Sequence, residues 1–425
     1  MYASNFKITA SVDPNTWPLS LDLLPKEAYL VGGAVRDALL KRRSDYLDLD
    51  FVLPGDAIQI ARNLANYYSA GFVVLDAERQ IARVVFDRAT VDLAKQEGDS
   101  LETDLQRRDF TINAIAYNPH TEKFIDPFQG ISDLQNRIIR MVKAANLEDD
   151  PLRLLRGYRQ AAQLNFTIEP ETKSVMRQLA GLLGTIAAER VQVELGYLLK
   201  SSQGTPWLTE AWQDKLLQSW FPDANQGLAQ IAAIDRAAVV LEANWQELGI
   251  KLHSAPKIPT SPLSKSASLL SLAKLASLLP SEPEAAAEQL QRLKYSRAEI
   301  QAVVTVLKYL PQLIIHESSE MSIREQFFFF KNVGVVFPAL VVSAVAAGMP
   351  VESLTTLIER YLNPDDQVAY PKALITGHDL MQRLNIPAGQ QIGKLLGEIQ
   401  LATAEGKIAT QEQALELAAK LMTNH

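Results

Sequence analysis

The feature that most constrains the fold of this chain is a change of sequence pattern near Asp150. Before it, short apolar runs typical of strands alternate with amphipathic helical segments. After it, stretches rich in Ala, Leu, Glu and Gln keep a helical period to the end. The sequence therefore predicts a small mixed α/β head followed by a long all-α remainder. We expect four parts: a head (1–145), a helical neck (146–203), a helical body (204–320) and a helical tail (321–425).

Composition limits the kinds of site that the chain can hold. Its 425 residues are too many for one ordinary core, which favours several domains. There is no cysteine, and none of the five histidines lies at metal-ligand spacing from another. A metal site would therefore have oxygen ligands, which favours Mg²⁺, with Mn²⁺ as the alternative. The start has no signal-peptide core and no apolar run is long enough to cross a bilayer, which predicts a cytoplasmic protein without a membrane partner.

The charge of the whole chain and its local clusters point in different directions. The net charge of −7 argues mildly against a nucleic-acid partner. Basic residues nevertheless cluster at 41–43, at Arg107-Arg108, and at Arg153, Arg156 and Arg159. Such clusters can place a positive surface on an acidic protein. Charge alone therefore leaves a nucleic-acid partner open.

The head is expected to contain a β-sheet with a phosphate-binding turn. The predicted strands span 28–31, 47–53, 71–75, 81–86 and 89–93, and the predicted helices span 34–40 and 57–68. Gly32-Gly33 forms a tight turn between the first strand and the first helix, where backbone N–H groups and a helix N-terminus can receive phosphate. Arg36 follows one turn later.

Alternation along the strand at 47–53 puts two carboxylates on one face. Leu47, Leu49 and Phe51 share the other face. Asp48 and Asp50 can thus bind the metal ions that phosphoryl transfer needs. Asp92, on a neighbouring strand, is the candidate third carboxylate. Taken alone, such a pair more often consists of two solvated side chains on an edge strand, so the assignment depends on the residues around it.

At these residues the sequence resembles the class II tRNA nucleotidyltransferases and bacterial poly(A) polymerases of the polymerase β superfamily. The motifs that carry the resemblance are Leu30–Leu40 with Asp48-Leu49-Asp50, Arg107–Ala114, Asp126-Pro127-Phe128 with Gly130, Asp150–Arg159, and Glu189-Arg190 with Glu194. The resemblance implies that Asp48 and Asp50 bind metal, with Asp92 as the third catalytic carboxylate. It also implies that Gly33, Arg36 and Arg108 contact the triphosphate, and that Asp109 and Asn113 shape the nucleotide pocket.

The segment Asp150-Pro151 can be interpreted in two ways. Asp is a good helix N-cap and Pro is favoured at the first helical position, so a capped helix with a stripe of Arg153, Arg156 and Arg159 explains it. The resemblance implies instead that Asp150 and Arg153 read the base, with Asp149 less certain in that role and Arg156 and Arg159 supporting the nucleotide. A carboxylate accepts from the exocyclic amino group of cytosine or adenine, and an arginine donates to the ring nitrogen. Guanine and uracil present a carbonyl to the carboxylate instead.

The connection Ala94–Asp99, before the Arg107-Arg108 motif, is shorter than the flexible loop of the complete CCA-adding relatives. This resembles the CC-adding members, so we expect addition of two cytidines to the tRNA 3′ end from CTP, with a separate A-adding enzyme completing the product. The alternatives are a complete CCA-adding enzyme that also uses ATP, a poly(A) polymerase, and a non-catalytic RNA-binding module. The segment Ile375–Leu396 resembles a C-terminal module that holds the tRNA elbow. Residues 204–320 carry no motif that indicates a role.

Overall fold

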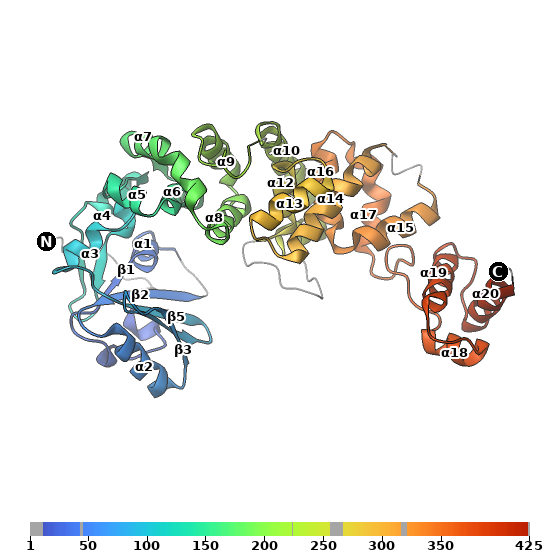
Figure 1. The fold of residues 1–425 in the computed structure, drawn as a ribbon, viewed down its shortest axis with the longest axis horizontal. Helices are drawn as coiled ribbons and strands as arrows, with labels where there is room; N and C mark the ends of the chain where they lie inside the picture. Colours follow the sequence, from blue (N-terminus) through green and yellow to red (C-terminus); the bar gives the residue numbers. More distant parts are fainter. Residues whose placement is uncertain (1–11, 43–45, 223, 256–266, 316–320, 424–425) are drawn as a thin grey trace. The chain divides into compact units, whose positions relative to one another are not determined.

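The computed structural model describes residues 12–42, 46–222, 224–255, 267–315 and 321–423 (Figure 1). The chain divides into two compact units, the first of residues 1–190 and 201–219 and the second of 191–200 and 220–425. The first unit contains all the strands, and the second is helical, which confirms the predicted α/β head and all-α remainder. The finer division into four parts stays a prediction. The segment Ser254–Ser268 is rich in Pro, Ser and Lys, which predicts a loop or linker, and most of it lies outside the described residues.

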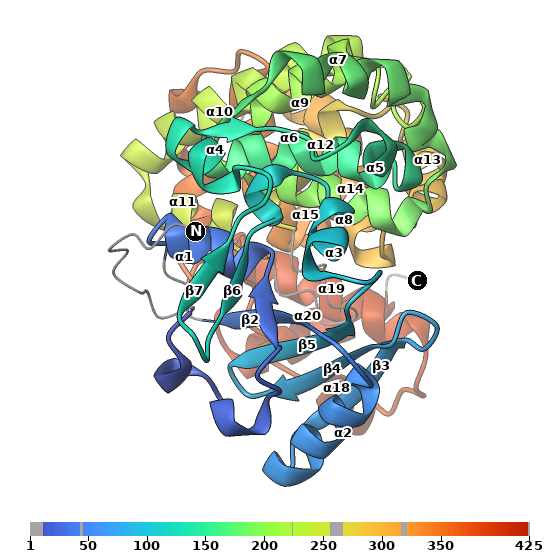
Figure 2. The same cartoon turned by 90° about the vertical axis from the view of Figure 1, so that its left-hand side faces the viewer.

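A seven-stranded mixed sheet forms the head. Its order is β3-β4-β5-β2-β1-β6-β7, and only the central β2–β5 pair is parallel among these strands. Figures 1 and 2 show α1 on one side of the sheet and α2 on the other. The strands are β1 Tyr29–Val31, β2 Leu47–Leu53, β3 Gly71–Asp76, β4 Ile81–Phe86, β5 Ala89–Lys95, β6 Ala116–Asn118 and β7 Lys123–Ile125.

The alternation predicted for β2 determines which of its faces is buried. Leu49, Phe51 and Leu53 are at most 1% exposed, while Asp48 is exposed and Asp50 is half-buried. The apolar residues anchor β2 in the core, so the two carboxylates are held on the opposite face. The helices of the first unit are α1 Gly33–Leu39, α2 Ala57–Tyr68, α3 Leu101–Gln106, α4 Gly130–Asn136, α5 Ala144–Asp149, α6 Leu152–Leu164, α7 Pro170–Leu179 and α9 Gly204–Gln213; α8, Ala188–Lys200, continues into the second unit.

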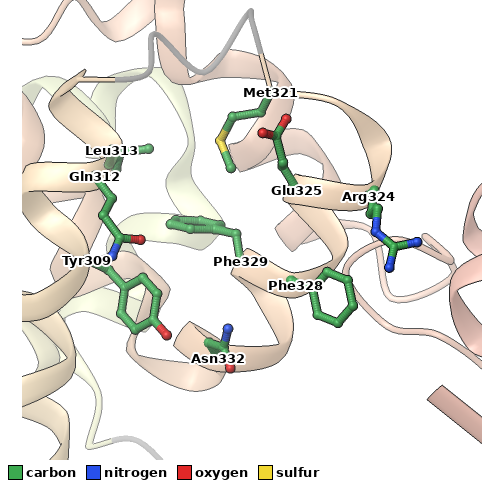
Figure 3. A pocket seen from close by; sticks show the side chains of 9 residues that line it. All are labelled: Tyr309, Gln312, Leu313, Met321, Arg324, Glu325, Phe328, Phe329 and Asn332. Carbon is green, nitrogen blue, oxygen red and sulfur yellow. The ribbon is translucent and has the colours of Figure 1, made fainter. Parts of the chain in front are cut away.

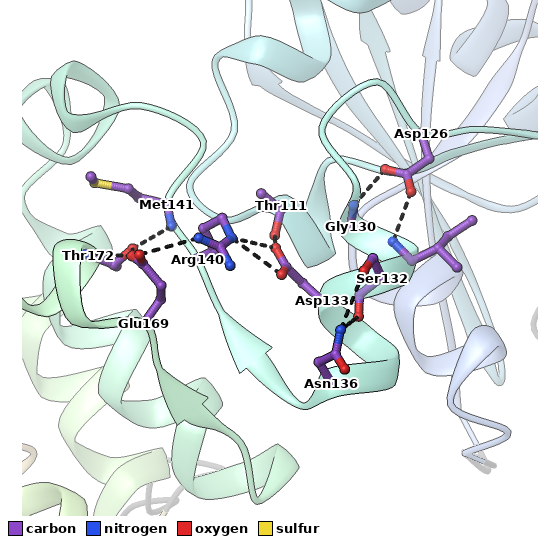
Figure 4. Close-up of polar contacts among 11 residues, drawn as sticks. Thr111, Asp126, Gly130, Ser132, Asp133, Asn136, Arg140, Met141, Glu169 and Thr172 are labelled. Carbon is purple, nitrogen blue, oxygen red and sulfur yellow. Dashed lines mark hydrogen bonds and ion pairs between the residues drawn. The ribbon is translucent and has the colours of Figure 1, made fainter.

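A small parallel pair and an ion-pair network join the sheet domain to the helices that follow it. Strands β8 (Ile138–Ile139) and β9 (Thr167–Ile168) pair with each other. The region after Asp150 was expected to be entirely helical, but it contains the two-residue strand β9. Arg140 lies between two carboxylates, 3.1 Å from Asp133 and 3.3 Å from Glu169 (Figure 4). Asp133 also accepts a 2.6 Å hydrogen bond from Thr111. The network fixes the short helix η3, Thr111–Asn113, which carries a predicted site residue.

The second unit is built from helices that pack around apolar side chains. Helices α10, α12, α14 and α16 contact one another (Figure 1). The last three helices have a hydrophobic core of their own, with Leu380, Ala414 and Ala418 fully buried. The helices are α10 Asn225–Asn244, α11 Gln246–His253, α12 Leu269–Ser277, α13 Pro283–Arg292, α14 Arg297–Ile315, α15 Ile323–Val333, α16 Phe337–Ala346, α17 Thr355–Leu362, α18 Gly377–Leu384, α19 Gln390–Ala404 and α20 Gln411–Thr423.

Two stretches of the second unit correct the expectation that no apolar run is long enough to cross a bilayer. Arg297–Ile315 and Ile323–Ala346 meet the length and hydropathy of a membrane span. The second is not one helix, because a turn at Gly334–Val336, with φ +51° at Gly334, separates α15 from α16. In the most apolar part of Arg297–Ile315, 39% of the residues are buried inside the protein, and in that of Ile323–Ala346 the share is 67%. Core packing in this unit therefore explains much of the apolar composition that sequence reading underestimated.

A cavity of about 330 Å³ lies between α14 and α15. Figure 3 shows Tyr309, Phe328 and Phe329 around it, with Gln312, Arg324 and Asn332 at its edge. None of the residues predicted to form a functional site lines this cavity. The predicted site lies in the first unit.

Candidate nucleotidyltransferase site

The paired carboxylates lie on the strand that crosses the middle of the sheet. Asp50 is opposite Asp92 in the parallel β2–β5 register, and Asp48 is opposite Thr90. Thr90 donates a 2.6 Å hydrogen bond from Oγ1 to Asp48 Oδ1. Burial, together with the neighbouring charges of Asp48 and Asp92, raises the pKa of Asp50 to about 7. The site therefore concentrates negative charge that a cation would offset.

The predicted third carboxylate is held by an arginine that sequence analysis missed. Arg83 on β4 donates to both oxygens of Asp92, from Nε at 2.6 Å and from Nη2 at 2.7 Å. Within the described residues, no group of three or more His, Cys, Asp or Glu side chains is arranged to hold a metal ion. Asp92 as a third metal ligand stays a prediction. The signal for Arg83 was available, since pairing the predicted strands 81–86 and 89–93 as a hairpin puts Arg83 opposite Asp92.

The turn before α1 leaves space between Asp50 and an arginine of the second motif. Gly32 has φ +72°, and a Cβ placed on it would lie 3.4 Å from Arg108 Nη1 and 3.5 Å from Asp50 Oδ2. A larger residue would thus be strained and would fill this space. Arg108 Nε is buried with no hydrogen-bond partner in the described part of the chain, and Nη2 is 3.5 Å from Asp104. Arg108 therefore has an unpaired, buried Nε, and its Nη1 lies close to the Gly32-Gly33 turn.

Asp109, Asn113 and Arg36 form a buried hydrogen-bond network. Asn113 donates from Nδ2 to Asp109 Oδ1 at 2.9 Å and accepts at Oδ1 from Arg36 Nη1 at 2.8 Å. Arg156 donates to Asp109 Oδ2 at 3.2 Å. Burial alone would raise the pKa of Asp109, but Arg156, Asn113 and the backbone N–H of Phe110 hold the pKa below its usual value. Asp109 is therefore a charged acceptor that orders the arginine and the amide around it.

Asp150 does not cap the following helix, which corrects the first interpretation of this segment. It ends α5, and α6 starts at Leu152 without a side-chain cap. The Asp150 carboxylate is directed instead to Arg190, which donates to Oδ2 at 2.9 Å. Oδ1 is buried and has no hydrogen-bond partner within the described ranges. This buried acceptor is a site that a ligand could satisfy, because such an atom is costly to leave unpaired.

Two of the arginines on α6, Arg153 and Arg156, contact the head. Arg153 donates from Nη1 to the backbone carbonyls of Arg107 and Asn146, at 2.8 and 2.9 Å, with its Nε 3.9 Å from Asp150. Arg156 binds Asp109 as described. Arg159 is bonded to Gln163 on its own helix, on an exposed face. Asp149, the neighbouring carboxylate, is exposed.

The connection after the third-carboxylate strand is even shorter than its sequence indicated. Ala94 and Lys95 belong to β5, so only Gln96–Ser100 separates this strand from α3. Glu97 anchors the connection, since its N–H donates to Asp104 at 3.1 Å and its carboxylate pairs with Arg107. Ser100 caps α3. The segment is therefore short and attached to the motif that carries Arg108.

Family models match three parts of the chain. Residues 28–140 match the poly A polymerase head domain, and residues 165–228 match a probable RNA and SrmB-binding site of polymerase A. Residues 266–419, which include 266–320 of the region where no motif was recognised, match the putative domain 2 of tRNA nucleotidyltransferases. The matches follow one another along the chain in the order that the motifs predicted.

Whole-chain relatives agree with these matches. A CC-adding tRNA nucleotidyltransferase of Synechocystis is 49% identical over 95% of this chain and 96% of its own. A CC-adding relative of Geobacter sulfurreducens is 28% identical over 92% and 91% of the two chains. A structure titled as a CCA-adding enzyme with CTP has the same fold, with a TM-score of 0.69 and 23% identity over 93% and 91% of the chains. The chain therefore belongs to the CC- and CCA-adding tRNA nucleotidyltransferases, as its motifs predicted.

Proposed function

We propose that this enzyme adds two cytidines to the tRNA 3′ end from CTP and stops before the terminal A. The observation that carries this proposal is the connection Gln96–Ser100, which leaves no room for the flexible loop associated with a switch from C to A. The CC-adding activity named for the Synechocystis relative supports it. A separate A-adding enzyme would complete the product; one from Deinococcus radiodurans is 29% identical to this chain. The cytoplasmic location stays a prediction.

In the proposed reaction, the tRNA 3′ hydroxyl releases its proton to solvent and its oxygen bonds to the α-phosphorus of CTP. The α–β phosphoanhydride bond breaks, and pyrophosphate leaves with the electrons of that bond. Asp48 and Asp50 would hold the Mg²⁺, or Mn²⁺, because two carboxylates suit an ion that takes its remaining oxygens from water and phosphate. When bound, this ion would supply positive charge against the triphosphate and the attacking oxygen. The raised pKa of Asp50 fits the role, since it reflects burial together with the neighbouring charges of Asp48 and Asp92, which a cation would offset.

Two arginines, Arg36 and Arg108, would bind the triphosphate. Arg36 lies on the helix that starts at the Gly32-Gly33 turn, and Nη1 of Arg108 lies close to that turn. Planar guanidinium groups and the N-terminal amides of a helix are both suited to phosphate oxygens. Their positive charge would also stabilise the pyrophosphate as it leaves.

Base selection is assigned to Asp150 and Arg153. The unpaired Oδ1 of Asp150 would accept a hydrogen bond from the exocyclic amino group of cytosine. Arg153 would donate a hydrogen bond to the ring nitrogen. The backbone carbonyls that bind Arg153 Nη1 hold its guanidinium in place for that contact. A uracil would direct a carbonyl at Asp150, leaving two acceptors facing each other, at a cost of roughly 1–3 kcal/mol.

The direct test is to incubate a tRNA that ends at the discriminator base with CTP, ATP, UTP or GTP separately and Mg²⁺. We expect two additions with CTP and none with the others. The second candidate is the complete CCA-adding enzyme, because adenine offers Asp150 and Arg153 the same amino group and ring nitrogen as cytosine. Addition of A to tRNA ending in CC would favour that enzyme. Extension of generic RNA with ATP would favour a poly(A) polymerase.

A further inference from the structure

We propose that Gln160 is a positioning residue that aims Arg36 at the triphosphate by fixing the orientation of the Asn113 amide. No motif singled out Gln160, and its side chain is only 4% exposed, on α6. It accepts a 3.1 Å hydrogen bond at Oε1 from Asn113 Nδ2. The proposal rests on the proposed function, because it gives Arg36 and Asn113 the roles described above.

The partners of Asn113 leave its amide one orientation. A carboxamide has a donor end and an acceptor end of nearly equal shape, and only its neighbours decide which way it points. Asp109 is charged and can only accept, so Nδ2 faces it, and the second hydrogen of Nδ2 is bonded to Oε1 of Gln160, which helps to hold the amide in this orientation. Oδ1 therefore faces Arg36, which can only donate.

This orientation in turn restrains the guanidinium of Arg36. Arg36 donates from Nη1 to Asn113 at 2.8 Å and from Nε and Nη2 to Asp37 at 3.0 and 3.1 Å. Three of the five N–H donors of the group are thereby committed and its plane is set. With the opposite amide orientation, the Asn113 NH₂ group would face the cation, and Arg36 would lose one of its two anchors.

Helix α6 forms hydrogen bonds with both Asp109 and Asn113. Arg156 donates to Asp109, and Gln160, one turn further along, accepts from Asn113. The two residues share a face of α6 because they are four positions apart. The helix that carries the base-reading Arg153 is therefore connected, through Gln160 and Asn113, to the arginine on the phosphate side of the site.

The test is a double-mutant cycle between Arg36 and Gln160, which do not bond each other. Gln160→Met keeps an unbranched side chain of similar length but removes the acceptor. We expect it to lower kcat/KM for CTP about tenfold, mainly through KM, because it leaves a buried donor of Asn113 unpaired. In an Arg36→Met background, Gln160→Met should lower kcat/KM for CTP by less than about twofold. Gln178→Leu, on the exposed face of α7, is the control and should leave kcat/KM unchanged.

Equal losses from Gln160→Met in both backgrounds, or no loss in either, would overturn the proposal. If Gln160→Met does not fold, as judged by its thermal transition, Gln160→Asn replaces it, since that amide is one methylene too short to reach Asn113. Failure of the proposed function gives a different result, because the unmutated enzyme would then not add cytidine to tRNA. Loss of stability alone would lower activity by the same factor in both backgrounds and would not produce the coupling.

Discussion

At the scale of single residues, the buried Oδ1 of Asp150 is the atom at which the proposed base selection is most directly tested. Asp150→Asn can direct its NH₂ group at the base, which suits a carbonyl rather than an amino group. We expect kcat/KM for CTP to fall about 10- to 100-fold, because one or two buried groups would lose their hydrogen-bond partners. The ratio of kcat/KM for UTP to kcat/KM for CTP should rise. Single-turnover incorporation of each nucleotide measures this. Asp149→Asn is the matched control, and an equal effect from this exposed neighbour would contradict the assignment.

The pKa of Asp50 makes a separate prediction about stability in the metal-free protein. Its pKa is about 7 in the fold against 3.8 unfolded, so the folded state binds the proton more tightly. The group therefore lowers the free energy of unfolding as pH rises from about 4 to 7, by at most about 1.4 kcal/mol per pH unit. Asp50→Asn removes this penalty. In EDTA, urea unfolding should show the variant gaining stability over the unmutated protein at pH 8.5 but not at pH 4, and an equal difference at both pH values would contradict this.

The residue scale also shows what sequence could and could not predict. Asp48 and Asp50 were placed on one face because strand alternation is a local property. The environment of Asp150 was not predictable in this way, because its partner Arg190 is 40 residues away. Gln160 had no motif to mark it, and its contact with Asn113 depends on how α6 packs against the head. Contacts between distant segments therefore account for most of what sequence analysis missed.

At the scale of elements, the approach of α6 to the second motif depends on a glycine. A Cβ on Gly157 would lie 2.8 Å from Met176 Cε and 2.9 Å from Phe110 Cζ. Gly157→Ala should therefore lower the free energy of unfolding by about 1–3 kcal/mol through overpacking, and should raise KM for CTP because Phe110 adjoins Asp109. Denaturant unfolding and initial rates measure both effects. Gly181→Ala, where no atom lies within 4 Å of the added Cβ, is the control. If both variants behave alike, close packing of α6 is not the cause.

Elements with a strong internal pattern were predicted well. The predicted bounds of β2, α2 and β4 agree with the structure, because long alternating or amphipathic runs define them locally. Strands β6 and β7 were missed, since three residues are too few to show a period and pairing with β1 creates them. Ala94 and Lys95 were assigned to a loop because the β2–β5 pairing that extends the strand is not local.

At the scale of the whole molecule, the last three helices form a module with its own core, built around Leu380, Leu395 and Ile399. A chain that ends at Lys372 should therefore keep the fold of its remaining helices. If the module holds tRNA, as its resemblance implies, KM for full-length tRNA should rise about tenfold or more while KM for CTP changes less than about twofold, because one of two linked contacts is lost. Steady-state kinetics with each substrate varied measures this. An unchanged KM for tRNA would contradict the predicted role of the module.

The proposed activity of this enzyme is the addition of two cytidines without the terminal A. The most direct measurement is the mass of a tRNA that starts at the discriminator base, after incubation with CTP and ATP together and Mg²⁺, beside the same tRNA already ending in CC. We expect a gain of two cytidines in the first case and no gain in the second. A product carrying CCA, or addition of A to the tRNA ending in CC, would contradict it and would show that the short Gln96–Ser100 connection does not limit the enzyme to cytidine.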